Sequence, residues 1–243
     1  MTPESHRAIA YTVRVSPKAK HVRITVTRDA DVVVTVPRRF PRRSVPAVVE
    51  ARRAWILRAL ERARARREAV RAEHGDVLPA TVVLPATGET LAIEYRASAA
   101  SGVTARQSGG VLALTGTVND EAACAAALGR WLVRSARASL DATLTELAIT
   151  HGFTVARLRV GLQRSRWGSC SAHGTVSLNA KLLFLPPELV RYVMLHELCH
   201  TRVMDHSARF WALVGQHDPG FELHRRALRD AERLVPPWAG ERR

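Results

Sequence analysis

Two histidines and a glutamate near residue 200 offer the side chains of a metal site. The segment reads His196-Glu197-Leu198-Cys199-His200, and five of the chain's ten histidines fall between residues 196 and 224. Residues four apart on a helix share one face, so both imidazoles would project from the same side about one turn apart. That spacing suits two neutral imidazoles that bind one Zn²⁺ at about 2.0–2.1 Å. The segment therefore predicts a metal-binding helix.

Glu197 follows the first of these histidines but points around the helix. From there its carboxylate can reach a water at the metal without taking a coordination position, which is the geometry of a general base. Apolar residues before it, from Leu189 to Leu195, predict a buried helix. Burial of two histidines and a glutamate costs free energy unless hydrogen bonds or a metal satisfy them. We therefore favour a metal-dependent hydrolase over a pair of hydrogen-bonded core histidines.

A catalytic zinc needs a third protein ligand and one open position. His206 is the preferred candidate, because six residues after His200 allow the chain to leave the helix and fold back beneath the metal. The three histidines have the spacing of the metzincin motif. However, Val203 stands where that motif has a turn glycine, and no methionine follows Met204 to form its Met-turn. The sequence therefore predicts a three-histidine site that is not an ordinary metzincin site.

Other residues compete for this site or complete it. Glu222 is the alternative third ligand, at a distance where a glutamate could arrive from the next helix. His217 and His224 are not assigned as ligands. A positive group must also stabilise the oxyanion that develops during hydrolysis. The candidates for that role are Arg166, Tyr192 and His217.

Composition and charge limit the class of protein. The chain has 243 residues, of which 47% are hydrophobic and 24% charged, as in a globular protein with a substantial core. No stretch approaches the about 20 apolar residues that span a bilayer, and residues 1–10 do not resemble a signal peptide. Three unpaired cysteines fit a reducing compartment. We therefore expect a cytoplasmic protein without a membrane segment.

The positive charge is concentrated in the first third of the chain. Residues 1–75 contain 18 Lys and Arg against 7 Asp and Glu, a net of +11 out of the total of +15. Such a region could attract nucleic acid or nucleotides, or it could simply solvate Arg-rich helices.

Alternating and helical patterns predict the elements that position these residues. Strands are expected at 12–15, 22–27 and 32–36, forming an antiparallel meander, and then a helix over about 44–73 with Ser44 as its N-cap. Further strands are expected at 81–84, 91–95 and 111–114, followed by a helix from Asn119-Asp120 to about 150 that buries Leu128, Leu132, Leu140, Leu144 and Leu147. The last expected elements are strands at 156–162 and 175–183 and helices at 188–204, 208–216 and 221–234.

Taken together, the motifs of this chain resemble the YgjP-like metallopeptidase family and, more distantly, SprT-like zinc proteases. The resemblance rests on Arg166-Trp167-Gly168-Ser169-Cys170, Leu178-Asn179, Pro186-Pro187-Glu188, the 196–200 segment and His206-Ser207-Ala208-Arg209-Phe210-Trp211. Val36-Pro37-Arg38-Arg39 and Trp55-Ile56 extend it into the N-terminal part. It covers most of the chain and is weakest between residues 76 and 150.

The resemblance implies an α+β protein with a zincin-type domain. Residues 1–117 would form a small, basic, β-rich region with one helix, and residues 118–243 a helical domain with a short antiparallel sheet; a boundary near residue 75 is the other natural division. One zinc per chain would be held by His196, His200 and His206, with Glu197 as base and acid. The strand at 175–183 would pair with an extended substrate.

The segment before that strand holds further candidates. Arg166 could bind a substrate carboxylate or phosphate, and Asn179 is a second candidate for substrate binding. Trp167 and Cys170 are interpreted as packing residues, and Cys199 as a core residue.

Two other functions fit the same residues. A nucleotide pyrophosphatase, acting for example on UTP, could use the metal site and hold the polyphosphate on the basic region. A nucleic-acid-binding module could instead carry a structural zinc whose fourth ligand is Cys170 or Glu222. The sequence does not distinguish a polypeptide from a nucleotide substrate, and it does not predict the oligomeric state.

Overall fold

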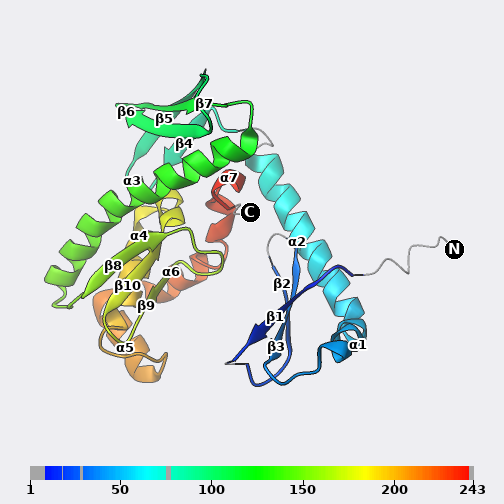
Figure 1. The fold of residues 1–243 in the computed structure, drawn as a ribbon. Helices are drawn as coiled ribbons and strands as arrows, with labels where there is room; N and C mark the ends of the chain where they lie inside the picture. The colour runs from blue at the N-terminus through cyan, green and yellow to red at the C-terminus, as the bar shows by residue number, and fades with distance from the viewer. Residues whose placement is uncertain (1–8, 18, 28–29, 75–77, 241–243) are drawn as a thin grey trace. The chain divides into compact units, whose positions relative to one another are not determined.

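The structure is a computed structural model that describes residues 9–17, 19–27, 30–74 and 78–240 (Figure 1). Contacts between residues divide the chain into two compact units, with the division between Glu73 and His74. Both units combine helices with small sheets, so the protein belongs to the α+β class, as expected. In the described part of the chain, no helix is both long enough and apolar enough to cross a membrane.

The first unit is a three-stranded sheet with two helices. Its elements are β1 (Thr12–Ser16), β2 (Arg23–Val26), β3 (Val32–Pro37), a 3₁₀ helix (Arg42–Ser44), α1 (Val45–Ala51) and α2 (Arg53–His74). The expected helix over 44–73 is therefore present, with a break at Arg52 between α1 and α2. Ser44 precedes α1 but makes no side-chain cap hydrogen bond.

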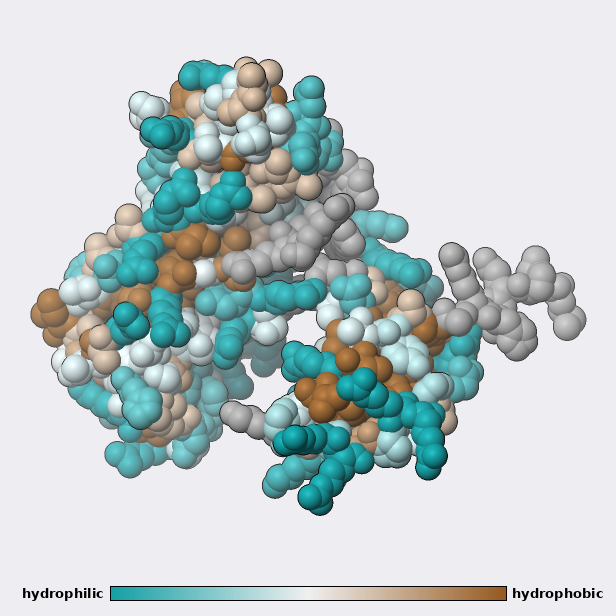
Figure 2. Space-filling model, in the orientation of Figure 1, coloured by the Kyte–Doolittle hydropathy of each residue, from teal (hydrophilic) through white to brown (hydrophobic). Residues whose placement is uncertain are grey.

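The strand order of this sheet corrects the expected antiparallel meander. The order is β1-β3-β2, in which β1 pairs with β3 in parallel and β2 pairs with β3 antiparallel. Alternation along a strand indicates which side chains are buried but not which strand lies next to it. Here β3 takes the centre, and its Val32, Val34 and Val36 are buried with Ile56 of α2. On the sheet face visible in Figure 2, a hydrophobic patch is bordered by hydrophilic side chains.

The second unit begins with a four-stranded sheet. Its strands are β4 (Thr81–Leu84), β5 (Glu89–Ala97), β6 (Val103–Ser108) and β7 (Val111–Gly116), in the order β4-β5-β7-β6. Three were expected from the sequence, whereas β6 was not. The following helix α3 (Glu121–Thr150) begins as predicted, because the Asp120 side chain accepts a hydrogen bond of 2.9 Å from the Ala123 N–H.

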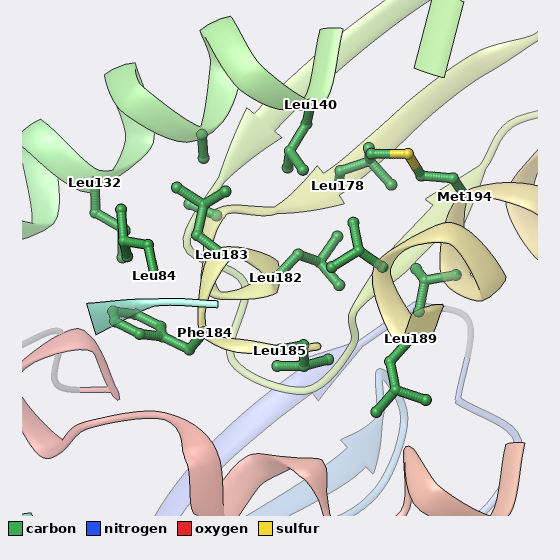
Figure 3. Packing of buried hydrophobic residues seen from close by; sticks show 14 of the residues in the cluster. Leu84, Leu132, Leu140, Leu178, Leu182, Leu183, Phe184, Leu185, Leu189 and Met194 are labelled. Atoms are coloured by element: carbon green, nitrogen blue, oxygen red, sulfur yellow. The ribbon is translucent and has the colours of Figure 1, made fainter. Parts of the chain in front are cut away.

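Helix α3 connects the core of this sheet to the core around the candidate site. All five leucines expected on its buried side are buried. Figure 3 shows Leu132 and Leu140 of α3 pointing toward Leu183, with Leu84 of β4 beside them. These residues belong to one continuous hydrophobic cluster. Through this cluster, the sheet β4–β7 packs against the rest of the second unit. The domain boundary expected at residue 117 stays a prediction.

The second sheet of this unit follows α3 in the chain and precedes the helix that carries the candidate site. It consists of β8 (Arg157–Gly161), β9 (Gly168–Cys170) and β10 (Thr175–Asn179), in the order β8-β10-β9. Because β8 is parallel to β10 and β9 is antiparallel to it, the sheet is mixed and not antiparallel as expected. The short strand β9 was not predicted, since its Gly-Ser sequence is typical of a turn.

The strand expected at 175–183 ends early. Residues Ala180–Phe184 form a 3₁₀ helix instead, because the Asn179 Oδ1 accepts a hydrogen bond from the Lys181 N–H and caps that helix. Leu182, Leu183 and Phe184 are thereby buried.

Short helices complete the second unit. They are α4 (Pro187–Cys199), α5 (Ala208–His217), α6 (Phe221–Ala227), a 3₁₀ helix (Ala231–Leu234) and α7 (Pro237–Gly240). Helix α4 ends at Cys199 and not near Met204 as expected. The chain turns there, because the backbone N–H groups of Thr201 and Arg202 bond to carbonyl oxygens three and not four residues back, and the Thr201 hydroxyl also donates to the Leu198 carbonyl oxygen. This early end allows residues 200–207 to fold back toward α4.

Candidate metal centre

Three histidines come together at the end of α4. His196 lies in the last turn of α4, His200 is its C-cap, and His206 lies in the segment before α5. One potential ligand atom from each lies within 4.8 Å of the others. The Nε2 atoms of His196 and His206 are 3.2 Å apart. Two ligands of a tetrahedral zinc with bonds of about 2.0–2.1 Å are separated by about 3.3 Å. The separation of these nitrogens therefore fits a shared metal ion.

The orientation of His200 is fixed by the chain that follows it. Its Nδ1 lies 3.0 Å from the carbonyl oxygen of Val203. A carbonyl oxygen only accepts hydrogen bonds, so Nδ1 carries the proton and Nε2 keeps its lone pair for a metal. The ring also stacks on Phe210, with 4.3 Å between the ring centroids. Val203, which stands where metzincins have glycine, thus supplies the carbonyl oxygen that orients the His200 ring.

Burial keeps His196 and His200 in their neutral form. Burial, together with smaller contributions from the neighbouring His200 and His206, lowers the pKa of His196 to about 3. The pKa of His200 is also lowered, mainly by burial. His206 is exposed and stacks against Trp211, with 5.6 Å between ring centroids. Neutral imidazoles are the form that binds a metal, so the site is prepared for one at neutral pH.

Glu197 is a buried carboxylate beside this cluster. The residue is 6% exposed, and its burial raises the pKa to about 8, although Arg166 acts in the opposite direction. Its Oε2 has no hydrogen-bond partner among the described residues. A buried carboxyl oxygen without a partner is costly unless a cation or a water satisfies it. This unsatisfied oxygen and the three clustered imidazoles together fit a divalent metal with a water beside it.

Gly168 of β9 makes room for Glu197. A Cβ added to Gly168 would lie 2.5 Å from Oε1 of Glu197 and 2.7 Å from its Cγ. A side chain at position 168 would therefore displace the carboxyl group. This contact joins residues 29 apart in the sequence, so the sequence alone did not reveal it.

The other predicted site residues lie in different surroundings. Arg166 is exposed in the loop before β9 and acts electrostatically on Glu197. Asn179 is buried, and its Nδ2 donates to the carbonyl oxygens of Gln163 and Arg166, at 2.9 Å each. Since Oδ1 also accepts from Lys181, we interpret Asn179 as the residue that holds the 163–166 loop. Its role in substrate binding stays a prediction.

The oxyanion candidates differ in their distance from the cluster. Tyr192 is buried on α4, and its ring lies 6.0 Å from that of His196. The Nδ1 atom of His217 instead lies 3.0 Å from Nδ1 of His151, and the His217 ring packs against Phe153. His217 therefore belongs to a separate cluster at the ends of α3 and α5.

The alternative ligands do not join the histidine group. Among the described residues, the group that could hold a metal comprises the three histidines and includes neither Glu222 nor Cys170. His224 pairs with Asp218, with 2.8 Å between Nδ1 and Oδ2. Trp167, Cys170 and Cys199 pack in or against the hydrophobic core, as interpreted from the sequence.

Comparison with known proteins agrees with this arrangement. The model of the YgjP-like metallopeptidase domain matches residues 20–231. The chain belongs to the YgjP-like family. At the level of the family it is a metal-dependent peptidase and hence a hydrolase. The family match spans both compact units, so the resemblance noted in the sequence is confirmed.

Two solved structures show partial similarity to the YgjP-like chain. The metallopeptidase zymogen abylysin of Pyrococcus abyssi has 23% sequence identity, covers 37% of this chain and 90% of its own, and has a TM-score of 0.34. The metallopeptidase zymogen jannalysin of Methanocaldococcus jannaschii has 20% identity, covers 40% of this chain and 97% of its own, and also has a TM-score of 0.34. No curated protein matches significantly.

Metal analysis of two variants tests the choice of the third ligand. We expect wild type and Glu222→Ala to retain about one zinc per chain after dialysis, because Glu222 lies outside the histidine group. His206→Ala should weaken binding by more than the about 10–100-fold that loss of a supporting residue costs. Elemental analysis and competition with a chromogenic chelator measure this. Full occupancy in His206→Ala together with loss in Glu222→Ala would reverse the assignment.

The pH dependence of stability tests the burial of Glu197. In metal-free protein the raised pKa of about 8 means that the folded state holds a proton which the unfolded state has released above pH 4.5. The free energy of unfolding should therefore fall as the pH rises from 6.5 to 8, by about 2 kcal/mol. Glu197→Gln should lack this decrease. Denaturant unfolding with a chelator measures it, and parallel curves for the two proteins would contradict the buried carboxyl.

Proposed function

We propose that this chain is a zinc-dependent peptidase in which Glu197 is the general base. The observation that carries the proposal is the combination of three clustered imidazoles with a buried carboxyl group that has an unsatisfied oxygen. His196, His200 and His206 would hold one zinc ion. Within the described chain no fourth ligand joins them. A position left open for water and substrate distinguishes a catalytic zinc from a structural one.

In peptide hydrolysis, the histidine cluster and Glu197 would have different roles. Zinc in this site would polarise the carbonyl of the substrate and lower the pKa of a water molecule there. Glu197 accepts the proton of the attacking water on its free Oε2 and later delivers it to the amide nitrogen of the leaving group. Its raised pKa suits both steps near neutral pH, because an efficient general base has a pKa close to the working pH.

An extended peptide substrate would bind along β9. The sequence favoured the strand at 175–183, but β10 lies between β8 and β9, so both of its edges are already paired. Strand β9 is an edge of this sheet and carries Gly168, which contacts Glu197. A peptide that adds to an exposed sheet edge gains main-chain hydrogen bonds, and here it would place its carbonyl groups beside the base.

The two alternative functions make different demands on the site. A structural zinc requires a closed coordination shell, which the three-histidine group does not supply. A nucleotide pyrophosphatase requires cations that hold a polyphosphate, and Arg166 is a candidate at the site. The nucleotide alternative and nucleic-acid binding by the basic N-terminal region stay predictions.

Glu197→Gln separates metal binding from catalysis. The amide keeps the size of the side chain but cannot accept a proton from water. We expect unchanged zinc content and a decrease of about 10²–10⁴-fold in the cleavage of an unstructured polypeptide, followed by electrophoresis and mass spectrometry. Glu222→Ala is the control and should keep activity. Turnover in Glu197→Gln equal to wild type would remove the base assignment, and pyrophosphate release from nucleoside triphosphates without peptide cleavage would favour the nucleotide alternative.

Gly168→Ala tests the contact that positions the base. The added methyl group would push the Glu197 carboxyl away from its place, and a displacement of about 1 Å can cost about a hundredfold in rate. We expect a lower kcat with unchanged zinc content. Ser169→Ala is the matched control, because alternate residues of a strand face opposite sides. Equal kcat values for both variants and wild type would show that the contact does not position the base.

A further inference from the structure

One face of α6 lies against the surroundings of the histidine cluster. Phe221, His224 and Arg225 are three and four residues apart, so they share a face of this helix. Phe221 stacks on Trp211 with 5.7 Å between ring centroids, and the His224 ring lies 5.9 Å from that of Tyr192. The Arg225 guanidinium carbon lies 4.3 Å from the centroid of the Trp211 ring.

The aromatic partners of this face are themselves neighbours of the proposed zinc ligands. The Trp211 ring centroid is 5.6 Å from that of His206 and 5.8 Å from that of His196. Arg225 is therefore separated from the cluster by one side chain. Its charge also contributes to the lowered pKa of His196. The guanidinium is part of the electrostatic environment of the site.

No carboxylate of the described residues neutralises the charge of Arg225. Among the described residues, no carboxylate forms an ion pair with Arg225. The nearby Asp218 is paired with His224 instead. A guanidinium that lies over an aromatic ring is held in place by a cation–π contact, while its N–H groups at the edge stay available to a ligand.

We propose that Arg225 binds a carboxylate of the substrate, so that the enzyme selects peptides with an acidic group near the cleaved bond. The proposal rests on the proposed peptidase function and adds to it the substrate class. The carboxylate belongs to an Asp or Glu side chain or to the C-terminus of the peptide. A planar guanidinium in a fixed orientation matches a carboxylate through two parallel hydrogen bonds. Arg166, on the Glu197 side of the cluster, adds positive charge to the same site.

Binding to a catalytically inactive holoenzyme tests this without requiring turnover. Zinc-loaded Glu197→Gln protein is titrated with fluorescent peptides in which one Glu is moved along a neutral sequence, and with the matching Gln series. Each peptide is made with a free and with an amidated C-terminus, so the two sources of the carboxylate are distinguished. Fluorescence anisotropy at low and high salt gives the dissociation constants.

The adjacent arginines of α6 provide a matched pair of variants. Arg225→Ala, made in the Glu197→Gln background, removes the guanidinium on Trp211. Arg226→Ala removes a neighbouring positive charge whose Nε donates to the backbone carbonyl oxygen of Glu222. Arg225→Lys keeps the charge but not the planar group that pairs with a carboxylate.

We expect at least one acidic peptide to bind about tenfold or more tightly than its neutral counterpart, with the difference reduced at high salt. Arg225→Ala should abolish the difference, Arg225→Lys should retain part of it, and Arg226→Ala should leave it intact. The proposal would be overturned if no acidic peptide bound more tightly than its neutral counterpart. It would also be overturned if Arg225→Ala kept the wild-type ratio of dissociation constants, or if Arg226→Ala lost as much of that ratio as Arg225→Ala. Tighter binding of a nucleoside triphosphate than of every acidic peptide, lost in Arg225→Ala, would assign Arg225 to phosphate and also overturn it. If wild type does not cleave the acidic peptides that it binds, the peptidase mechanism fails while the carboxylate site stands.

Discussion

The burial of one carboxylate beside three imidazoles is the constraint on which the rest of the second unit depends. Glu197 and His200 are among the few polar residues in the core, and an unpaired carboxylate in such surroundings costs several kcal/mol. A protein accepts that cost where the groups have a ligand to bind. The raised pKa of Glu197 and the lowered pKa of His196 are two consequences of the same burial.

Each neighbouring segment contributes one contact that makes this burial possible. Strand β9 presents a residue without a side chain to the Glu197 carboxyl, and the turn after α4 presents the Val203 carbonyl to His200. Asn179 ties the loop before β9 to the end of β10 through two hydrogen bonds. The contact between Gly168 and Glu197 joins residues 29 apart in the sequence, and the Asn179 hydrogen bonds join residues 13 and 16 apart. The geometry of the base therefore depends on the packing of the small sheet as much as on α4.

Positive charge is found both in the first unit and close to the histidine cluster. The net charge of the chain is concentrated in residues 1–75, most of which form the first unit. Within the second unit, the cations that act on the centre are Arg166 beside Glu197 and Arg225 on the surface of Trp211. These two side chains come from a loop and a short helix on different segments. Their positive charge acts locally on the histidine cluster and Glu197, whereas the charge of residues 1–75 is a property of a whole region.

The sequence by itself determined features that depend on residues close to one another. The spacing of His196 and His200, the Asp120 cap and the leucines of α3 follow from helix periodicity and local hydrogen bonding, so they were predictable. Only the tertiary structure decided the parallel pairing of β1 with β3, the central place of β10, the early end of α4 and the contact between Gly168 and Glu197. Periodicity reports which side of an element is buried but not what lies against it. The choice between His206 and Glu222 also required the fold. Both follow His200 closely enough in the sequence to reach it, but in the structure only His206 joins His196 and His200.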